Sequence, residues 1–184
     1  MIEPARRGWF ARPILWILPA SAVTAAALLF TVIPAGRVET QNRAPSPKLR
    51  VYRVRNGALT ILNAASQVRP GDSLQLAYIA GGAQYGAVVS LDGGGAAVVQ
   101  FPETGGEAQP LQAKGEVPLP NSLQVSAAPV FERYVLITAN APFPAATALA
   151  AAQKVAAEAG SSTAALTLPD GLAQTSVVLQ KIAP

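Results

Sequence analysis

The side chains that could carry chemistry in this sequence are serines, lysines and carboxylates, because the chain contains no cysteine and no histidine. These absences exclude a Cys or His nucleophile, an imidazole base, a disulfide and a Cys/His zinc site. A serine nucleophile would therefore need a lysine as its base. No serine lies in a G-x-S-x-G nucleophile elbow. The candidates for a Ser–Lys pair, none of which the spacing singles out, are Ser66, Ser73, Ser90, Ser122 and Ser126 with Lys114, Lys154 or Lys181.

The carboxylates of the C-terminal body lie in turns and loops. Asp72 follows Pro70-Gly71 and Asp92 precedes three glycines, so we expect both to accept hydrogen bonds from turn amides. Glu103 and Glu107 lack the Asp-rich spacing of a calcium loop and are expected to be solvated. The glycine runs at 81–82 and 93–95 lack the Lys-Ser/Thr of a phosphate loop. The sequence therefore assigns no catalytic, cofactor-binding or metal-binding residue, and we expect no enzyme and no cofactor.

The positive charge is concentrated near the N-terminus. The formal net charge is +4, and residues 1–48 hold six basic and two acidic side chains, whereas residues 49–184 hold eight of each. A neutral body does not supply the basic face that phosphate binding needs, so we expect no nucleic-acid partner. Arg50, Arg53 and Arg55 form a short basic strip, which is either a solvated strand face or a contact for anionic lipid.

An apolar run from Ile14 to Ile33 contains 20 residues without a charge. A helix of this length spans about 30 Å, the thickness of the bilayer hydrocarbon. The sequence therefore predicts a single transmembrane helix over residues 14–34, preceded by a short cytoplasmic head at 1–13 and in contact with membrane lipid. A cleaved signal peptide remains an alternative, because 20–22 reads Ala-Ser-Ala. A buried core helix is a second alternative.

The basic residues on the two sides of the apolar run do not decide its orientation. The short head and long body favour a single-pass protein of the bacterial inner membrane, with its C-terminal domain in the periplasm. Residues 35–48 contain Pro45 and Pro47 and show no periodicity, so they are interpreted as a linker between the helix and a domain over 49–184.

The body shows short alternating apolar runs separated by turn residues, which is typical of strands. Asn56-Gly57 predicts a tight hairpin, and 92–95 (DGGG) predicts another turn. An alanine-rich stretch after Pro144 predicts one helix over 145–159. We expect a mainly β domain, an antiparallel β-sandwich or small barrel with one helix. The expected strands are 49–54, 59–62, 73–80, 85–91, 96–101, 117–119, 123–127, 131–138 and 174–182.

Three segments resemble a bacterial envelope domain of unknown function: 68–78 (VRPGDSLQLAY), 86–102 (GAVVSLDGGGAAVVQFP) and 119–143 (LPNSLQVSAAPVFERYVLITANAPF). That domain forms the outer half of membrane-spanning anti-sigma-factor-like proteins, notably in myxobacteria. The resemblance covers roughly residues 45–184 and implies an outer domain that senses the envelope. Such proteins carry a cytoplasmic zinc-binding head that holds a sigma factor. Here about 13 residues without Cys or His precede the helix, so anti-sigma activity is not carried over.

Two functions follow as hypotheses. The first is a membrane-anchored, non-catalytic binding or sensing domain for an envelope or membrane protein. The alternative is a structural or assembly subunit of a membrane complex, since the small residues of 20–27 permit close helix–helix packing. An envelope hydrolase is a third hypothesis, which would need a Ser–Lys or carboxylate pair.

Overall fold

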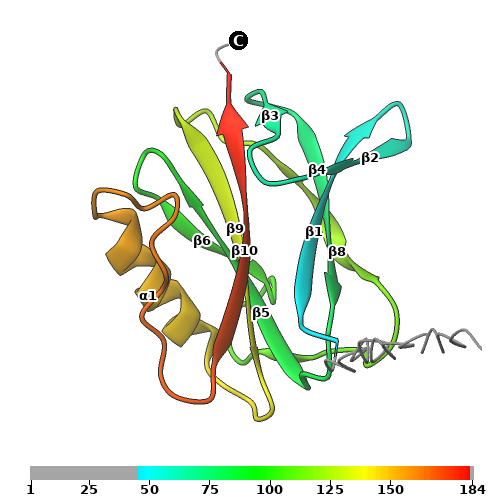
Figure 1. Cartoon of the computed structure of the whole chain (residues 1–184), viewed down its shortest axis with the longest axis vertical. Helices are drawn as coiled ribbons and strands as arrows, with labels where there is room; N and C mark the ends of the chain where they lie inside the picture. The colour runs from blue at the N-terminus through cyan, green and yellow to red at the C-terminus, as the bar shows by residue number, and fades with distance from the viewer. Residues whose placement is uncertain (1–44, 183–184) are drawn as a thin grey trace, which may run out of the picture. The chain divides into compact units, whose positions relative to one another are not determined.

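A computed structural model describes residues 45–182, which form a mainly β unit of two sheets and one helix (Figure 1). The predicted transmembrane helix, the head and most of the linker lie outside the described residues. The one helix of residues 45–182 does not have the length and apolar character that a membrane span requires. The elements are β1 (Lys48–Arg55), β2 (Ala58–Leu62), β3 (Gln67–Val68), β4 (Ser73–Ile79), β5 (Tyr85–Asp92), β6 (Ala97–Phe101), β7 (Gln109–Pro110), β8 (Val117–Gln124), β9 (Phe131–Ala139), α1 (Ala145–Ala156) and β10 (Ala173–Lys181).

The strands divide into a four-stranded sheet, β2-β1-β4-β8, and a six-stranded sheet in which β3-β10-β9-β5-β6 are ordered side by side and β7 pairs with β5. Two separate sheets correspond to the sandwich rather than the barrel. Most neighbours are antiparallel, as predicted, but β3 pairs with β10 in parallel. This exception arises because the chain crosses between sheets after β2 and adds a two-residue strand beside the end of β10.

The core between the sheets contains side chains from both. Val51, Leu74 and Leu76 of the four-stranded sheet pack in one cluster with Leu136 and Leu179 of the six-stranded sheet, and all five are fully buried. Alternation within the strands explains this, since every second side chain points inward. Sequence periodicity therefore locates this core correctly.

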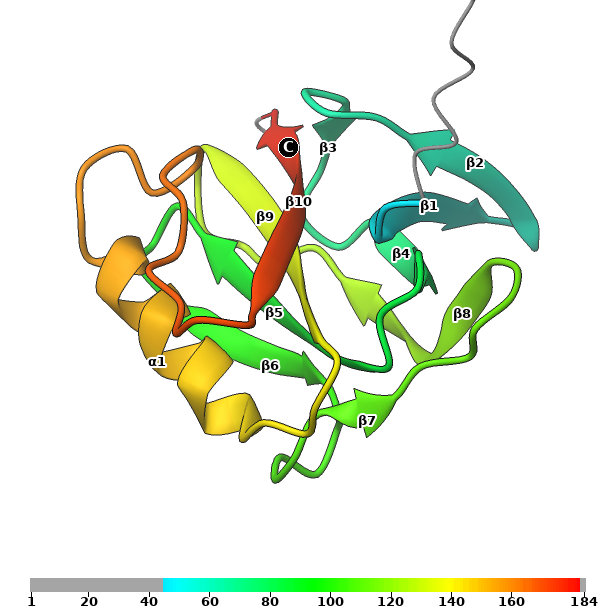
Figure 2. The same ribbon diagram turned by 60° about the horizontal axis from the view of Figure 1, so that its bottom comes forward.

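The helix α1 covers the other face of the six-stranded sheet, against β5 and β6 (Figure 2). Small side chains such as Ala148 and Ala152 let the helix lie close to Val89 and Ile137, and all four are buried. The helix ends at Ala156, three residues before the predicted end, and Gly160 follows with a positive φ of 84°. The helix predicted after Pro144 is therefore present, and it packs on a sheet face.

One predicted pair of strands is wrong. The segments 117–119 and 123–127 were expected to be separate, because Pro118, Pro120 and Asn121 interrupt the pattern. Residues 117–124 instead form the single strand β8, and 125–127 lie outside it. The prolines are tolerated because β8 lies at the edge of its sheet and needs hydrogen bonds on one side only. The hairpin at Asn56-Gly57 forms as predicted, with φ values of 50° and 78°.

Candidate functional site

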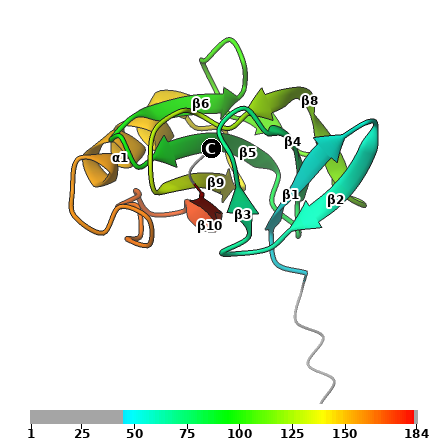
Figure 3. The ribbon, with the colours of Figure 1, turned by 90° about the horizontal axis from the view of Figure 1, so that it is seen from above.

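The strand β2 lies at the outer edge of the four-stranded sheet and carries no charge (Figure 3). Its cross-strand partners on β1 place Leu59 beside Val54 and Ile61 beside Tyr52, on the face turned away from the core. Leu59 is 59% exposed and Ile61 is 43% exposed. An edge strand with exposed apolar side chains and unpaired backbone groups is a surface that other chains can bind. We call Ala58–Leu62 the β2 edge.

The segment around the β2 edge is strongly basic. Residues 48–72 contain five basic side chains and one acid, Asp72. Arg53 and Arg55 share this carboxylate, at 3.2 Å each. Arg50 pairs at 3.1 Å with Glu116, which also accepts a hydrogen bond from the Tyr52 hydroxyl. The basic strip predicted from the sequence therefore exists, but two acids partly neutralise it.

Asp72 organises the turn that precedes β4. Its Oδ2 accepts a hydrogen bond from the Arg69 amide at 3.0 Å, as expected for a turn aspartate. Burial alone would raise the pKa of Asp72, but the Arg69 amide and the cations of Arg55 and Arg53 outweigh burial and hold the pKa below its usual value of 3.8. The charged form is therefore favoured in the folded state.

Replacing Asp72 with Asn is expected to destabilise the fold at neutral pH by about 1–2 kcal/mol, because a hydrogen-bonded ion pair is lost. Since the folded-state pKa is lowered, the contribution of Asp72 is fully present above its unfolded pKa and is lost as the pH falls through the folded value. Urea unfolding of both proteins at several pH values checks this. The difference in the free energy of unfolding between the two proteins should disappear as the pH falls below 3.8. A difference in the free energy of unfolding that stays constant down to acid pH would contradict the lowered pKa of Asp72.

A pocket of about 250 Å³ lies at the C-terminal end of the β2 edge. The basic residues Lys48 and Arg50 line it together with the neutral polar residues Asn63 and Thr175, and Arg50 also pairs with Glu116. Ile61 lines it as well, so the pocket is continuous with the β2 edge. We call it the basic pocket. Its residues are suited to a carboxylate or another small anion.

A second cluster brings Ser126 together with Lys181. The Lys181 Nζ donates a hydrogen bond to the Ser126 Oγ at 2.7 Å, and it forms an ion pair of 2.6 Å with Glu132. The Lys181 and Glu132 side chains are 3% and 7% exposed. Asp92 lies beside them, since its Oδ2 accepts from the Ser126 Oγ at 3.1 Å. Sequence spacing did not single out this Ser–Lys pair, because the two residues are 55 positions apart.

The geometry of this cluster indicates a structural role, in which side-chain hydrogen bonds join neighbouring loops. Lys181 Nζ donates in all of its three contacts, the third being to the Ala128 carbonyl at 2.9 Å, so no lone pair of the amine faces the serine. Asp92 Oδ1 accepts from the amides of Gly94 and Ala96, which is the predicted turn role. Together these bonds fasten the β5–β6 turn and the β8–β9 loop to the end of β10.

Ser126 is therefore expected not to react with a fluorophosphonate probe that labels activated serines, because Lys181 donates to its hydroxyl instead of accepting its proton. Labelling of the full chain that disappears in Ser126→Ala would contradict this. The same variant should lose about 1 kcal/mol of stability through its hydrogen bonds. Ser122, an exposed serine of β8, provides the matched control.

The β8–β9 loop, which these bonds hold in place, contains a strained residue. Val130 has a φ of 72°, which is unfavourable for a β-branched residue, and its side chain is 62% exposed. The neighbouring turn packs so closely that a Cβ on Gly93 would overlap the Pro129 carbonyl oxygen. The sequence indicated only a turn at 92–95; the close approach of Gly93 to another loop depends on the tertiary structure.

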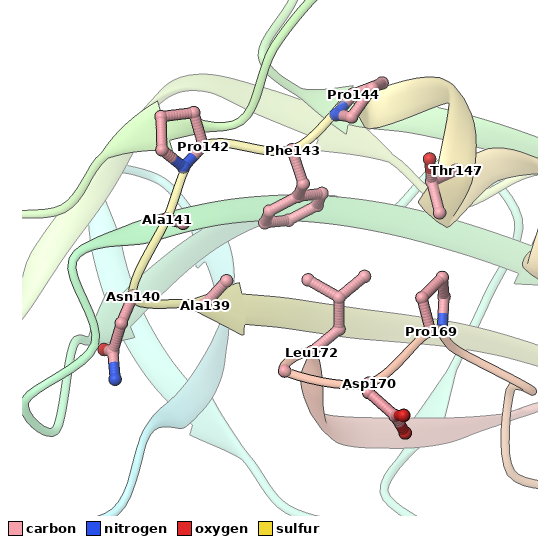
Figure 4. A pocket seen from close by; sticks show the side chains of 11 residues that line it. Ala139, Asn140, Ala141, Pro142, Phe143, Pro144, Thr147, Pro169, Asp170 and Leu172 are labelled. Atoms are coloured by element: carbon pink, nitrogen blue, oxygen red, sulfur yellow. The ribbon is translucent and has the colours of Figure 1, made fainter.

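A further pocket, of about 490 Å³, opens beside the start of α1. Figure 4 shows Phe143 and Leu172 pointing toward each other across it. Asn140, Thr147 and Asp170 supply its polar side chains. Since its walls are otherwise apolar, it has no arrangement suited to acid–base chemistry.

Metal-ligating side chains are not brought together among residues 45–182, where no group of three or more Asp, Glu, His or Cys residues could hold an ion. Glu103, which the sequence predicts to be a solvated loop charge, accepts a hydrogen bond from Asn121. Comparison with protein-family models, curated proteins and solved structures finds no match to this chain.

Proposed function

We propose that the protein is a membrane-anchored, non-catalytic binding domain that contacts a partner protein through the β2 edge. The observation that carries the proposal is the exposure of Leu59 and Ile61 on a neutral edge strand beside a basic pocket. Apolar side chains exposed beside cations are typical of protein-binding surfaces. The anchor at residues 14–34 and the periplasmic location rest on the sequence, as does the resemblance to the outer half of anti-sigma-factor-like proteins.

Site-specific photocrosslinking in intact cells tests the binding surface. A photoreactive amino acid at position 59 should give a discrete protein adduct, whereas the same group at position 98 should not. Val98 is the matched control, because it is an apolar strand residue that is 52% exposed in the other sheet. Adducts from both positions, or from neither, would contradict the proposed surface.

Two fractionation experiments test the anchor. The full chain should remain in the membrane pellet after alkaline carbonate extraction, and protease added to spheroplasts should digest its C-terminal body. Release at alkaline pH, or a protected body beside a digested periplasmic control, would overturn the anchor or the orientation. If the adduct from position 59 is a stoichiometric membrane subunit, the alternative function as an assembly subunit is favoured.

A further inference from the structure

We infer that the partner binds as an extended acidic segment, which adds to the β2 edge as a further strand and places a carboxylate in the basic pocket. This inference rests on the proposed function and specifies the chemistry of the partner. Its basis is the juxtaposition of an open strand edge, exposed apolar side chains and a cationic pocket on one border of the sheet.

The other sheet edges are less suited to strand addition. β8 contains Pro118 and Pro120, which lack amide donors. On the border of the other sheet, β3 is only two residues long and pairs with Gln180 and Lys181, and β10 itself contacts β1 of the four-stranded sheet. The remaining edge strand, β6, packs beside α1. The β2 edge has five residues without proline or charge, and within the described part of the chain β1 is its one paired neighbour. Unlike β8, which contains prolines, and β6, which lies beside α1, it lacks the features by which proteins block strand pairing.

The side chains of the β2 edge favour a partner with alternating apolar residues. An added strand would place its side chains alternately on the two faces of the sheet. On the outer face they would lie beside Leu59 and Ile61, as cross-strand neighbours. Main-chain hydrogen bonds then supply affinity, and the side chains supply specificity.

The charge around the edge favours an acidic partner over a second copy of this chain. Two copies joined through β2 would bring two segments 48–72 together, each with five basic residues against Asp72 and the paired Glu116. The like charges of the two segments would repel each other. The chain's own preceding segment, 36–44, is also basic, with Arg37 and Arg43 against Glu39. An acidic segment of another protein is complementary to the same surface.

The basic pocket provides the contact that distinguishes acidic from neutral segments. Lys48 and Arg50 line it together with Ile61, so a residue beyond the C-terminal end of the β2 edge would lie near both basic residues. Lys48 forms no ion pair with any of residues 45–182, and Arg50 pairs with Glu116 through Nε. A carboxylate in the pocket would be attracted by both groups.

The test uses two synthetic peptides with the same alternating valines and threonines, one carrying glutamates and the other lysines at the remaining positions. Binding to the full chain in detergent is measured by fluorescence anisotropy. We expect the acidic peptide to bind at least about tenfold more tightly, equivalent to about 1.4 kcal/mol. Added salt should weaken this binding. Equal binding of the two peptides, or binding of neither at millimolar concentration, would overturn the inference.

Two controls separate strand addition from simple charge attraction. The acidic peptide N-methylated at alternate amides keeps its charge but loses donors for one strand edge, and it should bind at least about tenfold more weakly. The variant Lys48→Gln/Arg50→Gln should lose most of the preference for the acidic peptide and keep its fold. Unchanged affinity in either control would contradict the inferred binding mode.

Other occupants of the edge give distinct results. Dimers that dissociate on Leu59→Lys substitution would assign the edge to a second copy and overturn the acidic partner. If the acidic peptide binds only after residues 1–44 are removed, the occupant of the β2 edge would be the chain's own N-terminal segment. A discrete adduct from position 59 in cells, combined with no acidic preference in vitro, would refute this inference and leave the proposed function standing.

Discussion

Replacing Glu132 with Ala is expected to lower the free energy of unfolding by about 3–5 kcal/mol. The variant leaves the Lys181 ammonium, which is 3% exposed, without its carboxylate at the end of β10. It also removes the acceptor for the Ser126 amide and one of the two carboxylates that accept from the Ser126 hydroxyl. A buried charge without a partner is among the most costly defects a fold can contain. Equilibrium urea unfolding at neutral pH, with the full chain in the same detergent, measures the change.

Two variants give the controls. Removing both charges in Glu132→Leu/Lys181→Met should recover part of the loss, because no buried charge then lacks a partner. Glu116→Ala breaks the more exposed ion pair with Arg50 and should cost no more than about 1 kcal/mol. A loss below about 1 kcal/mol for Glu132→Ala would show that the Lys181–Glu132 pair does not hold this end of the sandwich together.

The second large effect is expected at the β2 edge. Replacing Leu59 and Ile61 together with Ser should weaken binding of the acidic peptide about 30-fold, equivalent to about 2 kcal/mol. The estimate follows from partial burial of two apolar side chains, each of which contributes about 1.5–3 kcal/mol when fully buried. Anisotropy titration of the full chain measures the affinity.

The stability of this double variant should change by no more than about 0.5 kcal/mol, because both side chains are already exposed. Val98→Ser, which alters an apolar side chain of comparable exposure on β6, should leave the affinity unchanged. An equal loss of peptide affinity in the Leu59/Ile61 double variant and in Val98→Ser would mean that peptide binding does not depend on the β2 edge.

Local sequence signals predicted much of this fold. Asn56-Gly57 fixes the β1–β2 hairpin because both residues accept positive φ, and Asp72 adopts its expected turn role. The alternation of apolar residues in β4 correctly indicated a strand. The proline-interrupted segment at β8 was misread, because only its edge position explains how one strand accommodates Pro118 and Pro120.

The contacts between distant residues could not be predicted in the same way. Lys181 meets Ser126 across 55 positions because β10 pairs with β9 in one particular register. The exposure of Leu59 and Ile61 depends on which strand lies at the sheet edge, and sequence periodicity does not specify strand order. The basic strip was visible in the sequence, but its partial neutralisation by Asp72 and Glu116 appears only in the structure.

Hydrogen exchange of the β2 amides, followed by NMR on the full chain with and without the acidic peptide, tests the central claim most directly. Strand addition predicts slower exchange at alternate amides of Ala58–Leu62, because those pointing away from β1 gain hydrogen-bond partners. The amides of β6 should be unaffected. Unchanged exchange throughout β2 at saturating peptide, or protection confined to another edge, would contradict the claim that this edge is the binding surface.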